Sequence, residues 1–264
     1  MKKFIVLLLL VLSLTFTGCA NTSEHLPVIP PSVEITPPSS SPEQAEPETE
    51  EEQRKKRTYA VSAVNSLRVR SKPNGSSAVI GTLDKNDAVV CLELVNGYYK
   101  TTFKEKTAYV YADYCSILEV EPENEKIEKA IDLGSTLLGH PYVWGSERYH
   151  WGNGKLNSNF VAGEFDCSAL VLYIYYKSNG VVLDVTSRTQ SLNGVAVKRQ
   201  DLKRGDLMFF TNASRKDKTG IERIGHVGIY FGNNYILHTA SDHAVIEPIS
   251  NTRWGYYITA RRVV

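Results

Sequence analysis

The sequence predicts two folded parts, a small all-β barrel followed by an α+β domain in which a cysteine-bearing helix packs on an antiparallel sheet. Short β-rich runs separated by turn residues recur between residues 58 and 118, a spacing that is typical of small barrels. Farther along, an apolar run of helical length follows Asp166-Cys167, and two β-rich runs flank Gly232-Asn233-Asn234. The 264 residues suffice for domains of about 60 and about 140 residues besides an unfolded segment.

The first 18 residues have the features of an export signal. Lys2 and Lys3 precede an apolar run over 4–16, which is shorter than the about 20 residues that a membrane-spanning helix needs. The run ends in Phe16-Thr17-Gly18-Cys19, which resembles the cleavage site of bacterial lipoproteins. The resemblance implies removal of residues 1–18 and lipidation of Cys19, which would anchor the protein to the cell membrane. The alternative is an ordinary secretory signal followed by an incidental cysteine.

Residues 19–57 have the composition of a disordered tether. Seven of the 11 prolines fall here, together with the acidic run 48–52, and almost nothing in the segment could form a core. We expect an extended linker that holds the folded parts away from the membrane. The net charge of the chain is only +1, so a nucleic acid is not the expected partner.

Residues 58–118 are expected to form the barrel. Three of its segments, 67–73, 79–81 and 96–100, resemble those of bacterial Src-homology-3-like (SH3-like) domains. The resemblance implies a unit that contacts cell-wall peptides or packs beside a catalytic cleft. Strands are expected over 59–64, 67–70, 88–95, 98–102 and 108–110.

Two cysteines of the barrel have two possible states. Cys91 and Cys115 both fall at apolar positions of expected strands. An exported protein permits a disulfide between them, if their Cα atoms lie within about 7 Å. Two buried free thiols, acting as small apolar side chains, are the alternative.

The α+β domain, residues 119–264, is expected to carry its chemistry at Cys167. Asp166 is a good N-cap for the apolar run over 169–176, which places Cys167 in the first helical turn. The positive end of the helix dipole favours a thiolate there. Such a nucleophile also needs a base within hydrogen-bond reach.

His226 and His238 are the candidates for that base. They lie in the two β-rich runs, which we expect to pair as a hairpin with the three-residue loop 232–234. Phe231 would then face Tyr235, and His238 would face Gly228. His226 would share a face with His238 as a diagonal neighbour, close enough for the two rings to touch. A two-residue loop would place the rings on opposite faces.

The order of these motifs resembles that of NlpC-type cell-wall cysteine peptidases, which have a papain-like fold. The resemblance implies Cys167 as nucleophile, His226 as base and His238 as the residue that orients it. It also implies Tyr142 as an oxyanion donor beside the backbone N–H of Cys167. The matching segments are Pro141-Tyr142-Val143-Trp144-Gly145, Asp166-Cys167-Ser168, Arg204-Gly205-Asp206-Leu207, Gly225-His226-Val227-Gly228 and His238.

The resemblance also assigns residues that would bind substrate. Asp166 and Ser168 would hold the ammonium group of a peptide stem, and Trp144 would line the cleft, although packing in the core is its alternative. The family often has an arginine and an acidic residue just before a serine, where this chain matches only at Ser187 and Gln190 of 184–190. Residues 146–164 are longer than usual, polar and rich in Gly and Asn, so we expect a loop beside the cleft.

These features favour an extracytoplasmic, membrane-anchored hydrolase that cleaves peptidoglycan stem peptides between D-γ-glutamate and a diamino acid, without a cofactor. One alternative is an inactive wall-binding lipoprotein, and another is a thiol amidase or acyltransferase with a different envelope substrate. A zinc site formed by Cys167, His226, His238 and His243 is a further alternative. It is disfavoured because the chain has no closely spaced pair of the Cys-x2-Cys or His-Glu-x-x-His kind.

Overall fold

The computed structural model describes residues 55–239 and 242–264. The expected signal over 1–18, Cys19 and the tether up to residue 54 lie outside the described residues. Within the described ranges, no helix has the length and apolar character needed to cross a membrane.

The all-β unit consists of two antiparallel sheets. One has the strand order β4-β1-β8 and the other β3-β2-β7-β6-β5. The expected all-β unit is confirmed, but its limits differ: Arg57, predicted as the end of the tether, opens β1, and β8 continues past residue 118. The strands are β1 Arg57–Ser62, β2 Leu67–Arg70, β3 Val79–Leu83, β4 Ala88–Val90, β5 Glu93–Val95, β6 Tyr98–Phe103, β7 Lys106–Tyr111 and β8 Cys115–Val120.

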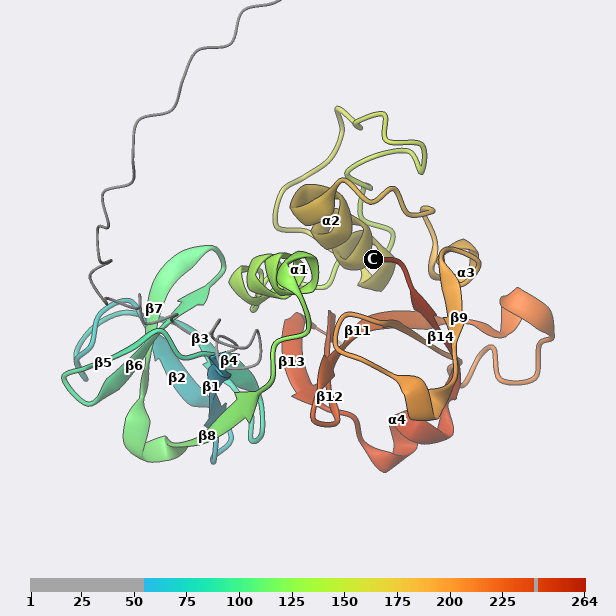
Figure 1. Ribbon diagram of the computed structural model, residues 1–264. Coiled ribbons are helices and arrows are strands. Elements are labelled where there is room, and N and C mark those ends of the chain that lie inside the picture. Colours follow the sequence, from blue (N-terminus) through green and yellow to red (C-terminus); the bar gives the residue numbers. More distant parts are fainter. Residues whose placement is uncertain (1–54, 240–241) are drawn as a thin grey trace, which may run out of the picture. The chain divides into compact units, whose positions relative to one another are not determined.

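The second part is an antiparallel sheet of six strands with four helices (Figure 1). Its strand order is β13-β12-β11-β10-β14-β9. This confirms the expected α+β class, with the helix that begins at Cys167 packed against β11 and β12. The elements are α1 Glu125–Thr136, α2 Cys167–Asn179, α3 Ser187–Gln190, β9 Val195–Val197, β10 Leu207–Phe210, β11 His226–Gly232, β12 Tyr235–Thr239, β13 Ala244–Pro248, α4 Asn251–Gly255 and β14 Tyr257–Arg262.

Side-chain alternation divides the core between the two faces of this sheet. Val227, Ile229 and Phe231 of β11 point to the face that α1 and α2 cover. Met208 and Ile236 point to the other face, where they pack with residues of and beside α4. Figure 1 shows α1 and α2 on one side of the sheet and α4 on the other. Because successive side chains of a strand alternate, His226 and His238 lie on the α4 face.

The hairpin that carries the two histidines differs from the expectation. Its turn contains only Asn233 and Asn234, both with positive φ, and Gly232 rather than Phe231 pairs with Tyr235. The predicted three-residue loop is therefore wrong. A bulge at Phe231 shifts the register, however, so that Ile229 pairs with Leu237. The bulge supplies one extra residue, and His238 still lies opposite Gly228.

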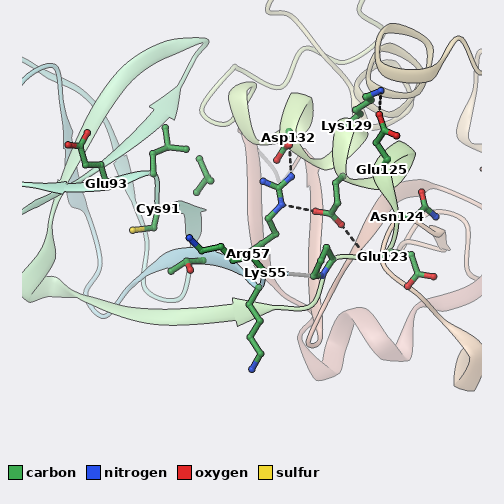
Figure 2. Close-up of a pocket in the computed structure, with 15 residues that line it drawn as sticks. Lys55, Arg57, Cys91, Glu93, Glu123, Asn124, Glu125, Lys129 and Asp132 are labelled. Carbon is green, nitrogen blue, oxygen red and sulfur yellow. Dashed lines mark hydrogen bonds and ion pairs between the residues drawn. The ribbon is translucent and has the colours of Figure 1, made fainter. Parts of the chain in front are cut away.

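Polar contacts, buried at Arg204 and exposed at Arg57, join the all-β unit to the second part within one compact unit. The Arg204 guanidinium donates to the Tyr59 hydroxyl at 2.7 Å and to the two Glu128 carboxylate oxygens at 2.8 and 3.1 Å. Arg57 of β1 pairs with Asp132 of α1 at 2.7 Å (Figure 2). The second part is thus held against the barrel by charges as well as by apolar packing.

Candidate active site

Cys167 is placed by the cap of α2. The Asp166 carboxylate accepts from the backbone N–H of Ala169 at 2.9 Å, and Gly180 ends the helix in the left-handed conformation. The expected N-cap is therefore confirmed. Cys167 is only 8% exposed, and its own backbone N–H has no acceptor among the described residues. A donor that is free at a helix start can bind a developing oxyanion.

His226, His238 and Glu247 form a hydrogen-bonded chain. His226 Nε2 lies 2.9 Å from His238 Nδ1, and His238 Nε2 lies 2.9 Å from Glu247 Oε1. The expectation that both rings lie on one face is confirmed. Gly228 makes this possible, because a Cβ at that position would come within 2.9 Å of the Cβ of His238.

Glu247 determines which nitrogen of each ring carries a proton. An ionised carboxylate only accepts hydrogen bonds, so His238 Nε2 must carry the hydrogen that lies between them. Neutral His238 then accepts at Nδ1, which requires the hydrogen of neutral His226 to be on Nε2. The lone pair of His226 is consequently at Nδ1, the ring nitrogen that does not face His238. His226 needs this tautomer to act as a base, because only a ring nitrogen with a free lone pair can accept the proton of the Cys167 thiol.

The thiol and the imidazole are both neutral at rest. Burial, followed by the charge of Asp166, raises the pKa of Cys167 to about 11, although hydrogen bonds from the backbone N–H groups of Val227 and Ser168 oppose this. Burial, aided by the nearby His238 and Arg253, lowers the pKa of His226 well below its ordinary value. The expectation that the helix start favours a thiolate is therefore wrong, because burial raises the pKa of Cys167 by more than the nearby backbone N–H groups lower it.

Tyr142 lies beside the thiol. Burial raises the pKa of its hydroxyl, and the nearby Cys167 and Asp166 raise it further. Tyr142 and His226 line the same cavity of about 580 Å³, together with residues of β10 and of the segment around α4. A substrate carbonyl entering from this cavity would meet His226 and the Tyr142 hydroxyl together.

The residues predicted to bind an ammonium group are already occupied. Arg148, from the loop 146–164, donates through Nη2 to Asp166 Oδ2 at 2.8 Å and to Ser168 Oγ at 3.1 Å. Ser187 is buried in the first turn of α3. Gln190 of α3 donates to the Ser168 carbonyl at 3.0 Å, which fixes α3 against the start of α2.

Trp144 does not belong to the core. Its side chain is 84% exposed, so the alternative of a core residue is wrong. It is also absent from the lining of the cavity beside His226.

Among the described residues the structure contains neither a disulfide nor a metal site. Cys91 and Cys115 are free thiols in this structure, and burial raises the pKa of Cys115 to about 11. In the two described ranges, no three His, Cys, Asp or Glu side chains are grouped so that they could hold a metal ion.

A larger cavity, of about 960 Å³, lies beside α1 and the first strand and is lined by Arg57, Cys91, Glu123 and Asp132, among others (Figure 2). No candidate catalytic residue lines it. Its walls carry both lysines and carboxylates, several of them already paired with one another. Size alone is therefore a poor guide to the site in this protein.

Comparison with known sequences identifies the part that contains this site. The profile of the NlpC/P60 family matches residues 139–263, and that of the bacterial SH3 domain matches residues 65–116. Residues 139–263 form an NlpC/P60 domain. The matched range includes Tyr142, Cys167, His226, His238 and Glu247. The papain-like fold and the SH3-like unit inferred from sequence are thereby confirmed.

Similar proteins include two enzymes of Bacillus species. The chain is 36% identical over 157 residues to peptidoglycan DL-endopeptidase CwlO of Bacillus licheniformis, covering 58% of this chain and 31% of that protein. It is 33% identical over 135 residues to a gamma-D-glutamyl-L-lysine dipeptidyl-peptidase of Bacillus cereus, covering 50% and 35%. This chain thus spans about a third of each of these relatives. A crystal structure of an NlpC/P60 family protein from Bacillus cereus superposes with a TM-score of 0.42 at 23% identity, covering 78% of this chain and 63% of that one.

Sequence reasoning missed Glu247 and Arg148. Glu247 lies on β13, where His238 pairs with Val245, so it is the diagonal neighbour of His238 on the same face. A carboxylate that lies two residues after the strand partner of a histidine can be predicted to contact that histidine. This prediction requires the pairing of β12 with β13 to be known. Arg148 lies 18 residues before Asp166 in an irregular loop, where no periodicity predicts what a side chain contacts.

Proposed function

We propose that this protein is a cysteine endopeptidase that hydrolyses peptidoglycan stem peptides at the bond from the γ-carboxyl of D-glutamate to the diamino acid. The observation that carries the proposal is the chain His226–His238–Glu247, together with a cysteine at a helix start whose sulfur accepts from the backbone N–H of Val227, the residue that follows His226. Both lie inside a match to the NlpC/P60 family. The names of the two Bacillus relatives support the substrate class.

In the proposed first step, Cys167 Sγ attacks the carbonyl carbon of the scissile amide while its proton moves to Nδ1 of His226. The thiol and the imidazole start neutral, so the proton transfer accompanies the attack instead of preceding it. The oxyanion that forms would accept from the backbone N–H of Cys167 and from the Tyr142 hydroxyl. His238 and Glu247 hold the ring of His226 and stabilise its positive charge.

In the remaining steps, His226 gives its proton to the nitrogen of the leaving diamino acid, the carbon–nitrogen bond breaks, and a thioester with Cys167 remains. Water then attacks the thioester carbonyl, with His226 taking one of its protons. The glutamyl carboxylate is released and the thiol regains its proton. No metal ion or organic cofactor takes part in this proposal.

The location of the protein is part of the same proposal. We infer an extracytoplasmic protein, anchored through lipidated Cys19, with the tether carrying the SH3-like unit and the peptidase domain toward the wall. Replacing Cys19 with Ala should release the mature protein from membranes or block its maturation. If the Cys19→Ala protein still sediments with membranes after its signal is removed, the anchoring proposal is wrong.

The activity can be tested with purified protein and muropeptides of known composition, followed by mass analysis of the fragments. The wild-type protein should release fragments that end in D-glutamate, and Cys167→Ala should release none. Binding without cleavage would instead favour the wall-binding alternative, and cleavage at another bond would favour an amidase. Added chelator should leave the rate unchanged, whereas strong inhibition would favour a zinc enzyme.

A further inference from the structure

The subsite beside Cys167 that would hold the amine of a stem peptide is filled by a side chain of the protein itself. Asp166 Oδ1 accepts from the Ala169 N–H and from the Ser168 hydroxyl. Asp166 Oδ2 accepts from Arg148 Nη2 at 2.8 Å, and the same nitrogen lies 3.1 Å from Ser168 Oγ. Arg148 Nη2 thus occupies the place, relative to the carboxylate and the hydroxyl, that a substrate ammonium nitrogen would need.

Arg148 is also held on its other sides. Its Nε donates to the carbonyl oxygen of Val185 at 2.6 Å, and its Nη1 donates to the carbonyl oxygen of Ser146. The side chain is only 16% exposed. A planar guanidinium fixed at three of its corners is already organised before any ligand arrives, so an incoming ammonium would have to displace several hydrogen bonds at once.

The charge of the subsite follows from this arrangement. Asp166 carries the negative charge at this point and Arg148 neutralises it, so an ammonium group would gain little attraction and would lie close to a second cation. The guanidinium has five N–H groups, and its contacts with the described residues use four. The free N–H on Nη1 suits a neutral carbonyl oxygen.

We propose that Arg148 is a specificity-determining residue that makes this subsite select stem peptides whose N-terminal alanine is acylated over those with a free amine. The acyl amide offers a carbonyl oxygen and no charge. The inference rests on the proposed function, and it makes the protein an enzyme of intact wall, where the stem is joined to glycan through an amide, and not of released stem fragments.

The test uses one pair of synthetic tripeptides, L-Ala-γ-D-Glu-L-Lys with a free N-terminus and the same peptide N-acetylated on alanine. The wild-type protein should cleave the acetylated peptide with a kcat/KM at least tenfold higher than that of the free peptide. Arg148→Gln should reduce this ratio at least tenfold, mainly by lowering KM for the free peptide. Arg188→Gln is the matched control, since it removes an arginine of α3 that pairs with Glu222 and not with Asp166.

Each result has a separate meaning. A wild-type protein that cleaves the free peptide equally well or better overturns the inference and leaves the proposed function intact. An unchanged ratio in Arg148→Gln overturns the role of Arg148. If neither peptide is cleaved, the proposed function fails, and calorimetric binding of both peptides to the Cys167→Ala protein decides the inference. Tenfold tighter binding of the acetylated peptide supports it, and equal, weaker or absent binding of that peptide overturns it.

Discussion

Removing the carboxylate of Glu247 tests the hydrogen-bonded chain behind His226. The carboxylate lies 2.9 Å from His238 Nε2, and His238 is completely buried, so that nitrogen loses its acceptor in Glu247→Ala. A hydrogen bond to a charged group contributes about 1.5–3 kcal/mol. The positive charge develops on His226 only during catalysis, so the loss should appear in the barrier.

With about 1.4 kcal/mol for each factor of ten, Glu247→Ala should lower kcat by about 10- to 150-fold with little change in KM. The Glu247 side chain is 30% exposed, so water can replace part of the interaction, and the lower half of this range is expected. Glu247→Gln keeps an acceptor oxygen without the charge and should lose less, about threefold to tenfold.

The assay is steady-state hydrolysis of the N-acetylated tripeptide, with thermal melting to confirm that each variant is folded. Asp242→Asn is the matched control, because Asp242 also pairs with a histidine, His243, at 2.8 Å, but outside the chain that ends at His226. A Glu247→Ala protein whose kcat stays within threefold of wild type, while melting normally, would refute the role given to Glu247.

Three further predictions concern titration and stability. Because burial raises the pKa of Cys167 to about 11, its alkylation by iodoacetamide should keep accelerating up to about that pH; a plateau reached by pH 7 would show a resting thiolate instead. Burial raises the pKa of Asp87 from 3.8 to about 6, so the folded state favours the protonated carboxyl group. This preference adds about 3 kcal/mol to the free energy of unfolding below pH 4. The contribution is lost as the pH rises through 6. Asp87→Asn should remove that dependence in urea unfolding at pH 4 and pH 7, and an identical slope in both proteins would contradict it. In Glu128→Ala the Arg204 guanidinium, which is 3% exposed, stays buried without its carboxylate partner. This variant should lower the free energy of unfolding by about 3–5 kcal/mol. A change below about 1 kcal/mol in the same unfolding assay would mean that the pair is not coupled to folding.

The elements that sequence predicted well are those set by local chemistry. The helix α2 is predicted by a capping aspartate and an apolar run, which act over one or two turns. The strands β2 and β6 follow from turn residues on either side. The missed strand β3 contains a glycine in its centre, and its side chains before Leu83 are exposed or half-buried, so neither composition nor alternation distinguishes it from a loop.

The resting charge of the site could not be predicted in the same way. The helix dipole is a local property that sequence reveals, but the burial of Cys167 arises only on folding. Folding brings Tyr142, Arg148 of the loop 146–164 and Val227 of β11 close to its sulfur. The contact between Arg148 and Asp166 also could not be predicted from local sequence. Asp166 and Val185, the partners of Arg148, lie 18 and 37 residues away, and the contact decides the charge of a subsite that the motif alone described as anionic.

In the hairpin, the prediction that His226 and His238 share a face is confirmed, although the predicted three-residue loop is wrong. The sequence sets how many residues separate His226 from His238. Whether the two side chains share a face of the hairpin depends on whether an odd or an even number of residues lies between paired positions. The sequence-based prediction places the odd residue in the turn, whereas the chain has a two-residue turn with both asparagines at positive φ and takes up the odd residue in a bulge at Phe231. Either arrangement restores the pairing of His238 with Gly228. The bulge has the additional effect of keeping Phe231 buried beside Tyr59 of the barrel, so the same irregularity that aligns the two histidines also contributes to the packing between the peptidase domain and the SH3-like unit.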